Sequence, residues 1–453
     1  MAREYDIVVI GAGPGGYAAA EKAARLGARV AVVEKDRWGG TCAHVGCIPT
    51  KALLAGSRRY AELKKLERLG TAVSGASFDY RGLKRHKEQM VRLAAAGVRK
   101  TLQDAGAERL EGTGHILSPS EVEVIGTSGE RARLRARGVL IAWGSEPLSL
   151  PCVRLSDRVM NSDGFLALNK LPSSAVVVGG GAIGVEFANF LSELGIRVTL
   201  VELLGQILPS EDRDAADFLA AELTRAGVEI HTSTRMTSLE EREKEVILIG
   251  EKEGRELTVR AECALIAAGR RPLIHAGELD RLGIAYDSHG GIAVTELQET
   301  SVENVYAVGD VTGGLFLAHR ASAQGRALAD HLFGDGEFFY YEKAVPTVVY
   351  THPGLARVGL TEKEARARGL NTEIRRAEHG ANMTARTELM GNGFVKALFY
   401  SGKVCGVTIV GDGASELIAA ASLAVTGEMT ERDLRKWVLP HPSLGELLGL
   451  FAP

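Results

Sequence analysis

A strand, a glycine-rich turn, a helix and a second strand ending in an acid occur twice along this chain, and this duplication limits the fold more than any other feature. The first copy starts with an apolar segment at residues 5–10, followed by the turn GAGPGG at 11–16 and an alanine-rich segment at 17–26. A second apolar segment at 29–33 then ends at Glu34. This order is typical of a dinucleotide-binding βαβ unit.

The spaced glycines of this turn have different physical tasks. Gly11 permits a tight turn, Gly13 lets the backbone approach a pyrophosphate, and Gly16 lets the helix pack closely on the strand. Phosphates would bind the N–H groups at the helix N-terminus, and Glu34, 23 residues after Gly11, can accept hydrogen bonds from a ribose. With strand, helix and acid all in place, dinucleotide binding is favoured over an ordinary glycine turn.

The second copy repeats the first about 168 residues later. An apolar strand at 175–178 leads into the turn GGGAIG at 179–184, a helix at 185–194 and a strand at 197–201. Glu202 again lies 23 residues after the first glycine of the turn. Two independent matches are much harder to obtain by chance than one, so the sequence predicts two bound dinucleotides.

The remainder of the chain predicts at least one further domain, and 453 residues suffice for about three. Residues 304–310 form an apolar strand ending in Gly-Asp, where an acid can meet a sugar or polyol hydroxyl; a simple strand-ending turn is the alternative. From about Glu342 the pattern changes to strands at 347–350, 393–399 and 403–409 with helices between them, which predicts a separate α+β domain.

Charge, apolar runs and cysteine usage exclude several classes of protein. Lys and Arg total 54 against 57 Asp and Glu, which disfavours a nucleic-acid-binding surface. The longest apolar run, Leu417 to Val425, is half the ~18 to 20 residues of a membrane-spanning helix. The N-terminus shows no charged leader, and five cysteines are an odd number, so we expect a reducing cytoplasm. Cys152, Cys263 and Cys405 are predicted to be buried thiols.

Cys42 and Cys47, five residues apart, are the strongest chemical signal outside the repeats. On a regular helix this spacing separates the Cα atoms by roughly 8 to 9 Å, beyond the ~7 Å limit for a disulfide. A bond therefore requires an irregular turn, which Gly46 and Pro49 would permit. A redox pair is favoured over a zinc site with His44 and over two inert thiols.

In this order the segments resemble the flavin-dependent pyridine nucleotide-disulfide oxidoreductases, and within them the dihydrolipoamide dehydrogenases. The resemblance covers essentially the whole chain, and it rests on both glycine fingerprints, the pair Cys42/Cys47 followed by Lys51, AGR at 268–270, Gly309-Asp310 with LAH at 317–319, and HPSLGE at 441–446. It implies an α/β fold with two Rossmann-like domains, for FAD and NAD, and a C-terminal α+β dimerisation domain. The implied segments are FAD-binding (1–146), NAD-binding (147–266), a second FAD-binding part (267–338) and dimerisation (339–453).

The resemblance also implies roles for individual residues. FAD would be held by Gly11, Gly13, Gly16, Glu34, Lys35, Thr41, Lys51, Gly114, Asp310 and Ala318. NAD would be held by Gly179, Gly181, Ile183, Gly184, Glu202, Gly269 and Arg270. NAD is favoured over NADP because Glu202 can accept a hydrogen bond from a 2′-hydroxyl and would repel a 2′-phosphate. The alternative interpretation of Arg270 is an ordinary solvated charge.

Catalysis is assigned on the same basis. Lys51 would lie near flavin N5 and pair with Glu186; a surface lysine and a helix-face acid are the alternatives. His441 would be the acid/base, oriented by Glu446 and reaching across a homodimer to the disulfide of the other subunit. The implied reaction is oxidation of dihydrolipoamide on the lipoyl domain of an acyltransferase or of a glycine-cleavage carrier, with reduction of NAD+. The alternatives are an NAD(P)H-dependent reductase of another disulfide and a flavin-bearing assembly scaffold. Trp143 stands where relatives usually have threonine.

Overall fold

The computed structural model of the protein describes residues 3–151 and 153–451, which fold into two compact units. The first unit runs to Ala52 and adds Lys84–Leu148 and Arg270–Tyr340; the second comprises Leu53–Leu83, Ser149–Gly269 and the chain from Tyr341 onward. The boundaries of the four segments expected from the sequence remain predictions. Among the described residues, no helix has both the length and the apolar character needed to cross a bilayer.

A mostly parallel sheet forms the centre of the first unit. Its parallel strands lie in the order β3-β2-β1-β5-β18, and β4 pairs antiparallel with both β3 and β5. β1 and β2 are buried almost throughout, as expected of strands covered on both faces. The strands are β1 (Arg3–Ile10), β2 (Val30–Glu34), β3 (Glu108–Ser118), β4 (Glu121–Gly126), β5 (Arg131–Ile141) and β18 (Val305–Ala307), with the short pairs β6 (Ser145–Pro147)/β15 (Arg270–Pro272) and β16 (Tyr286–Asp287)/β17 (Gly291–Ile292).

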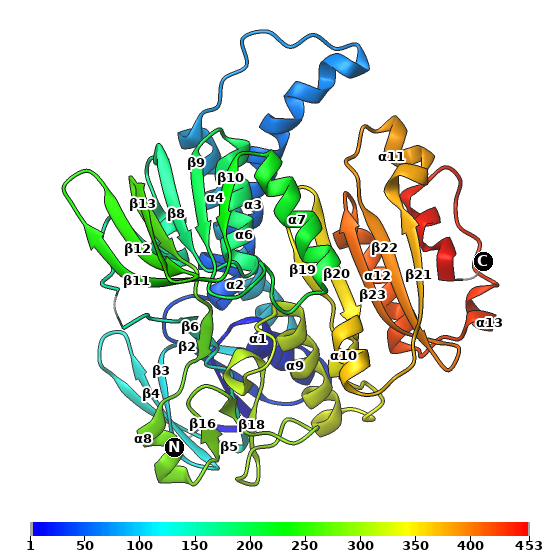
Figure 1. Cartoon of the computed structure of the whole chain (residues 1–453). Coiled ribbons are helices and arrows are strands. Elements are labelled where there is room, and N and C mark those ends of the chain that lie inside the picture. Colours follow the sequence, from blue (N-terminus) through cyan, green and yellow to red (C-terminus); the bar gives the residue numbers. More distant parts are fainter. Residues whose placement is uncertain (1–2, 152, 452–453) are drawn as a thin grey trace. The chain divides into compact units, whose positions relative to one another are not determined.

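Two helices pack closely in the first unit, α1 (Pro14–Arg25) and α9 (Ala318–Phe333) (Figure 1). A Cβ at Gly325 of α9 would overlap the carbonyl oxygen of Gly15, so glycine is what allows this approach. α1 begins three residues before the predicted helix because Pro14 fits the first helical position. The unit also contains α2 (Gly40–Val45), α8 (Ala276–Leu282), the 3-10 turn η2 (Gly309–Thr312) and most of α4 (Tyr80–Ala105).

The second unit contains a parallel sheet of order β10-β9-β8-β14-β7. Its central strands β8 and β14 consist mainly of small and branched apolar residues and are completely buried. Its strands are β7 (Val159–Asn161), β8 (Ser174–Val178), β9 (Arg197–Val201), β10 (Val228–His231) and β14 (Cys263–Ile266), and the helices around it are α5 (Ser162–Ala167), α6 (Ala182–Glu193) and α7 (Arg213–Arg225). An antiparallel sheet, drawn green in Figure 1, adds β11 (Thr234–Glu241), β12 (Val246–Lys252) and β13 (Arg255–Ala261).

The C-terminal part of the second unit is an antiparallel sheet of order β19-β20-β23-β22-β21. Helix α12 (Ala414–Thr426) packs on β20 and β23. The strands are β19 (Thr347–Val349), β20 (Gly354–Gly359), β21 (Glu373–Glu378), β22 (Phe394–Tyr400) and β23 (Lys403–Gly411); the shorter helices are η1 (Leu63–Leu69), η3 (Glu342–Ala344), α10 (Glu362–Ala367), η4 (His379–Ala381), α11 (Met383–Thr387), α13 (Glu431–Leu434) and η5 (Leu444–Phe451).

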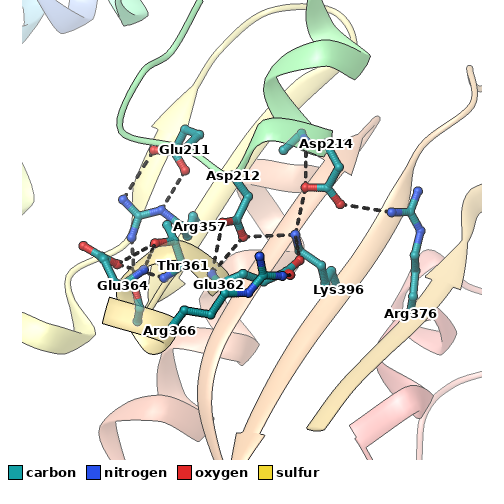
Figure 2. Close-up of polar contacts among 12 residues, drawn as sticks. Glu211, Asp212, Asp214, Arg357, Thr361, Glu362, Glu364, Arg366, Arg376 and Lys396 are labelled. Carbon is teal, nitrogen blue, oxygen red and sulfur yellow. Dashed lines mark hydrogen bonds and ion pairs between the residues drawn. The ribbon is translucent and has the colours of Figure 1, made fainter. Parts of the chain in front are cut away.

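A buried lysine connects this sheet to the start of α7. The Lys396 side chain on β22 is 2% exposed, and its ammonium lies 3.0 Å from Asp212, 2.8 Å from Asp214 and 2.7 Å from Glu362. Figure 2 shows these carboxylates converging on Lys396, with the buried Arg357–Glu211 pair beside them at 2.7 Å. No sequence pattern predicted the Lys396 cluster or the Arg357–Glu211 pair.

Candidate active site

The first glycine turn has the geometry that a dinucleotide requires. Gly11 has φ +106°, and a Cβ at Gly16 would overlap the Gly11 carbonyl oxygen, so α1 can approach β1 only with glycine there. A Cβ at Gly13 would meet no described atom within 4 Å, which leaves open space at the start of α1. The Glu34 carboxylate accepts a hydrogen bond from the Ala12 N–H at 2.7 Å and so faces the turn. Glu34 also accepts from the N–H groups of Asp36 and Arg37, which leaves about one acceptor site on its carboxylate for a ribose. These residues fit a dinucleotide.

The second turn repeats this geometry. Gly179 has φ +108°, a Cβ at Gly184 would overlap the Gly179 carbonyl oxygen, and Gly181 again borders open space. Glu202 accepts hydrogen bonds from the N–H groups of Gly180 at 2.5 Å and Leu204 at 2.7 Å. Both acids are therefore anchored to backbone next to their own glycine turns, as expected for ribose-binding residues.

The cysteine pair lies across a break between two helices. α2 ends at Val45, Gly46 departs from helical geometry with ψ −114°, and α3 (Cys47–Glu62) begins directly after it. A Cβ at Gly46 would lie 2.9 Å from the Thr41 carbonyl oxygen, so glycine permits the irregular turn that the spacing required. Pro49 lies instead in the first turn of α3, where a proline is tolerated.

The two thiols interact directly. The hydrogen bond with Cys47 raises the pKa of the Cys42 thiol, burial raises it further, and the charge of Lys51 opposes both effects. Once the pair has lost one proton, loss of the second is therefore disfavoured. A group with a raised pKa needs an external base before it can act as a nucleophile.

Asp310 lies in a polar cluster near the predicted flavin site. The Ser145 hydroxyl donates to Asp310 at 2.5 Å, and Arg270 donates to the same hydroxyl at 2.9 Å. Burial raises the pKa of Asp310, against the lowering effect of Ser145, Arg270 and Arg320. Arg270 thus contacts Ser145 rather than only solvent.

The remaining cofactor residues lie as follows. A Cβ at Gly114 would approach Ile10 to 3.1 Å, and Ala318 begins α9. Lys35 follows β2 and Thr41 lies on α2, while Ile183 is partly buried near the start of α6. Gly269 has φ +116°. Lys51 belongs to the first unit and Glu186 to the second, so their pairing remains a prediction; Glu186 is 5% exposed.

His441 and Glu446 are brought together by the C-terminal segment. His441 Nδ1 lies 2.9 Å from Glu446 Oε1, and the Ser443 N–H donates to the other carboxylate oxygen at 3.0 Å. The Ser443 N–H and the His441 ring lower the pKa of Glu446, which keeps it ionised. The imidazole is 75% exposed in the chain, and the His441–Pro442 peptide is cis. The Glu446 carboxylate therefore fixes the orientation of the His441 ring.

Several features were not found from the sequence. Trp143 contacts His275 edge to face at 4.6 Å, and Ser145 links Arg270 to Asp310. His352, like His441, precedes a cis proline, and it lies among several carboxylates. The His-Pro dipeptide, which occurs at both places, is the one signal that could have drawn attention to His352. The other three cysteines differ: Cys263 is buried as predicted, Cys405 is only half-buried, and Cys152 lies outside the described residues.

Comparison with known proteins gives the same assignment over almost the whole chain. Residues 5–325 match the pyridine nucleotide-disulphide oxidoreductase family, and residues 345–450 match the dimerisation domain of that family. The chain belongs to the pyridine nucleotide-disulphide oxidoreductases. The second match supports assembly of this oxidoreductase as a homodimer.

Relatives within the family point to one subgroup. A dihydrolipoyl dehydrogenase of Geobacillus stearothermophilus is 35% identical over 450 residues, covering 99% of this chain and 95% of the relative. One from Bacillus subtilis is 36% identical, with 98% and 95% covered. The solved structure of LpdA from Mycobacterium tuberculosis is 28% identical with a TM-score of 0.91 over 98% of both chains. A Cu(II) complex of RclA from Escherichia coli, an HOCl-induced flavoprotein disulfide reductase, is also 28% identical, with a TM-score of 0.86 over 99% of both chains.

These matches confirm the predicted family, the α/β fold class with its C-terminal domain, and an enzyme of the dihydrolipoyl dehydrogenase type with FAD and NAD as cofactors. They also confirm a general disulfide oxidoreductase role.

Proposed function

We propose that this oxidoreductase oxidises protein-bound dihydrolipoamide to lipoamide and reduces NAD+ to NADH. The observation that carries the proposal is the Cys42–Cys47 pair across the Gly46 break, in a chain similar to dihydrolipoyl dehydrogenases over nearly its full length. Over one cycle dihydrolipoamide gives up two electrons and two protons, and NAD+ retains both electrons and one proton. FAD, when bound, would transfer the electrons from thiol to pyridine nucleotide.

The roles of the protein groups follow from their environments. His441 of the partner subunit would take a proton from dihydrolipoamide, and the substrate thiolate would attack the Cys42 sulfur of the disulfide. That attack forms a mixed disulfide with Cys42, breaks the Cys42–Cys47 bond and leaves the thiolate on Cys47. Attack by the second substrate sulfur would then release lipoamide and free the Cys42 sulfur. Glu446 would stabilise the protonated imidazole during the transfer.

The nucleotide preference and the partners belong to the same proposal. Glu202 supports NAD over NADP because its anchored carboxylate would repel a 2′-phosphate. The proposed working form is the homodimer. The proposed partner is a lipoyl domain of an acyltransferase or of a glycine-cleavage carrier, and the proposed compartment is a reducing cytoplasm.

A steady-state comparison tests the proposal. We expect dihydrolipoamide to reduce NAD+ with a kcat/KM at least about a hundredfold above that for NADP+, and glutathione or coenzyme A thiols to be poor substrates. The Cys47→Ser variant should bind flavin and lose lipoamide turnover. Full turnover by that variant would contradict the assigned electron route.

The likeness to RclA favours a second candidate, an NAD(P)H-dependent reductase of another disulfide. This second candidate differs from the first in the direction of the reaction, because NADH would be consumed rather than formed. Faster consumption of NADH with other disulfides than with lipoamide would support this second function.

A further inference from the structure

The segment after β19 runs along one face of α6. The Tyr350 N–H donates to Glu186 at 2.9 Å, and the His352 N–H donates to Asn189 at 3.3 Å. The His352 ring lies 3.5 Å from Glu193 on the same helix. Because residues three, four and seven apart share a helix face, the three α6 side chains form one stripe. The segment therefore contacts α6 over two turns, from Glu186 onward.

His352 is also the centre of a buried charge cluster. Its Nε2 lies 3.2 Å from Asp412 and 3.9 Å from Glu62, while Nδ1 faces Glu193. The His352 side chain is 12% exposed, that of Asp412 4% and that of Glu193 7%. A neutral imidazole can donate a proton from only one nitrogen, so only the imidazolium serves the carboxylates on both sides. Among the described residues, Glu193 Oε1 has no hydrogen-bond partner, so its attraction to the ring depends on charge.

The other charges around the ring leave an excess of carboxylates. Arg58 lies 3.5 Å from Asp412 and 2.9 Å from Glu62, and the exposed Arg59 lies 3.0 Å from Glu62. These two cations face three carboxylates, so the charges balance only when His352 is protonated. Burial by itself would lower the pKa of His352, but the polar interactions with Asp412 and Glu193 outweigh it and raise the pKa. In return the imidazolium, with a smaller contribution from Arg58, overcomes the effect of burial and lowers the pKa of Asp412 to about 2.

The cluster also includes the helix that carries the redox cysteine. Ser57, Arg58 and Glu62 are in the second half of α3, which begins at Cys47, and the Ser57 hydroxyl donates to Glu193 at 2.5 Å. Lys51 lies seven residues before Arg58 on α3, and Glu186 lies seven residues before Glu193 on α6. Seven residues are two helical turns, so on each helix the predicted Lys51–Glu186 pair and the His352 cluster share a face.

We propose that protonated His352 is a positioning residue, which holds the second half of α3 against α6 and thereby fixes each of the two helices that carry the predicted flavin-site residues Lys51 and Glu186. This inference rests on the proposed roles of those two residues. When His352 loses its proton, one carboxylate contact loses its counter-charge and the two helices are held less firmly. A group with a raised pKa makes its full contribution below its unfolded pKa of ~6.5 and loses it as the pH rises through the folded value.

Flavin reduction by NADH in the holoenzyme tests this inference without any disulfide substrate. The rate should fall with rising pH through a titration above pH ~6.5, and the flavin absorption of the resting enzyme should follow the same titration. His352→Gln should remove this titration from both signals and make reduction roughly tenfold slower at pH 6.5. His289→Gln, which changes an exposed histidine of the first unit, should leave both profiles unchanged.

Carboxylate variants supply a second signature. Asp412→Asn should keep the titration and lower its midpoint by about one pH unit, because the imidazolium loses its shortest ion pair. Glu62→Gln, at a more exposed and more distant carboxylate, should lower the midpoint by less, and it serves where His352→Gln does not fold. A wild-type titration in His352→Gln, or unchanged midpoints in both carboxylate variants, would overturn the inference. If the wild-type enzyme shows the His352 titration but no lipoamide turnover, the proposed substrate is wrong and the positioning role stands.

Discussion

At the scale of a single residue, Gly46 sets the geometry of the redox pair. It interrupts the helix between Cys42 and Cys47, and its missing Cβ leaves space beside the Thr41 carbonyl oxygen. The cysteine spacing alone showed that an irregular turn was needed, whereas the structure showed that Gly46 provides it and that Pro49 lies inside α3.

Gly46→Ala should therefore separate the two sulfurs. A Cβ 2.9 Å from the Thr41 oxygen forces the turn to open, at a cost of about 1 to 3 kcal/mol in stability. We expect slower re-formation of the disulfide after reduction, measured by thiol titration of the oxidised holoenzyme. Gly70→Ala is a useful control because a Cβ there meets no described atom within 4 Å and only the positive φ is strained. Equal thiol titrations for both variants would show that Gly46 has no such role.

At the scale of elements, different glycines within a turn serve helix packing and nucleotide binding. Gly184 lets α6 approach β8, and Gly181 borders open space at the helix start. Gly184→Ala should lower stability by about 1 to 3 kcal/mol because its Cβ overlaps backbone. Gly181→Ala should leave the melting temperature nearly unchanged and weaken NADH binding, measured by fluorescence titration, because the new methyl group occupies the predicted pyrophosphate position. A reversed pattern would exclude this division of roles.

The Lys396 cluster joins α7 and α10 to β22. Burial alone would lower the pKa of Lys396, but hydrogen bonds to Asp214, Glu362 and Asp212 raise it, so the lysine is charged at pH values below its usual pKa. The stability that this charge contributes is lost as the pH rises through the raised folded pKa.

Lys396→Met should lower the free energy of unfolding by about 3 kcal/mol, because it leaves the buried Asp212 without its counter-charge. The matched control is Lys403→Met on the neighbouring strand β23, whose exposed pair with Glu428 should contribute less than about 1 kcal/mol. Urea unfolding at pH 7 compares the two. Similar losses of unfolding free energy in the two variants would mean that burial does not strengthen the ion pairs of Lys396.

At the scale of the whole molecule, the proposed site needs two chains. In a heterodimer of a Cys42→Ser chain and a His441→Gln chain, one site combines an intact cysteine pair with an intact histidine from the other chain. Mixing the two inactive variants under exchange conditions should therefore restore lipoamide turnover to about a quarter of the wild-type value, since half the dimers are mixed and each has one working site. Absence of recovery in confirmed heterodimers would place His441 at the cysteines of its own chain.

The sequence by itself determined the two nucleotide-binding units, the glycines that they need, the fold class and the spacing of the redox cysteines. These features depend on residues close together in the chain, where turn geometry and strand periodicity leave a readable pattern. Only the tertiary structure brought Ser145 between Arg270 and Asp310, placed Lys396 among three carboxylates and surrounded His352 with charges from α3, from α6 and from Asp412 directly after β23. Such contacts join residues far apart in the chain, and a single charged side chain has no periodicity, so its partner is decided only when the elements pack.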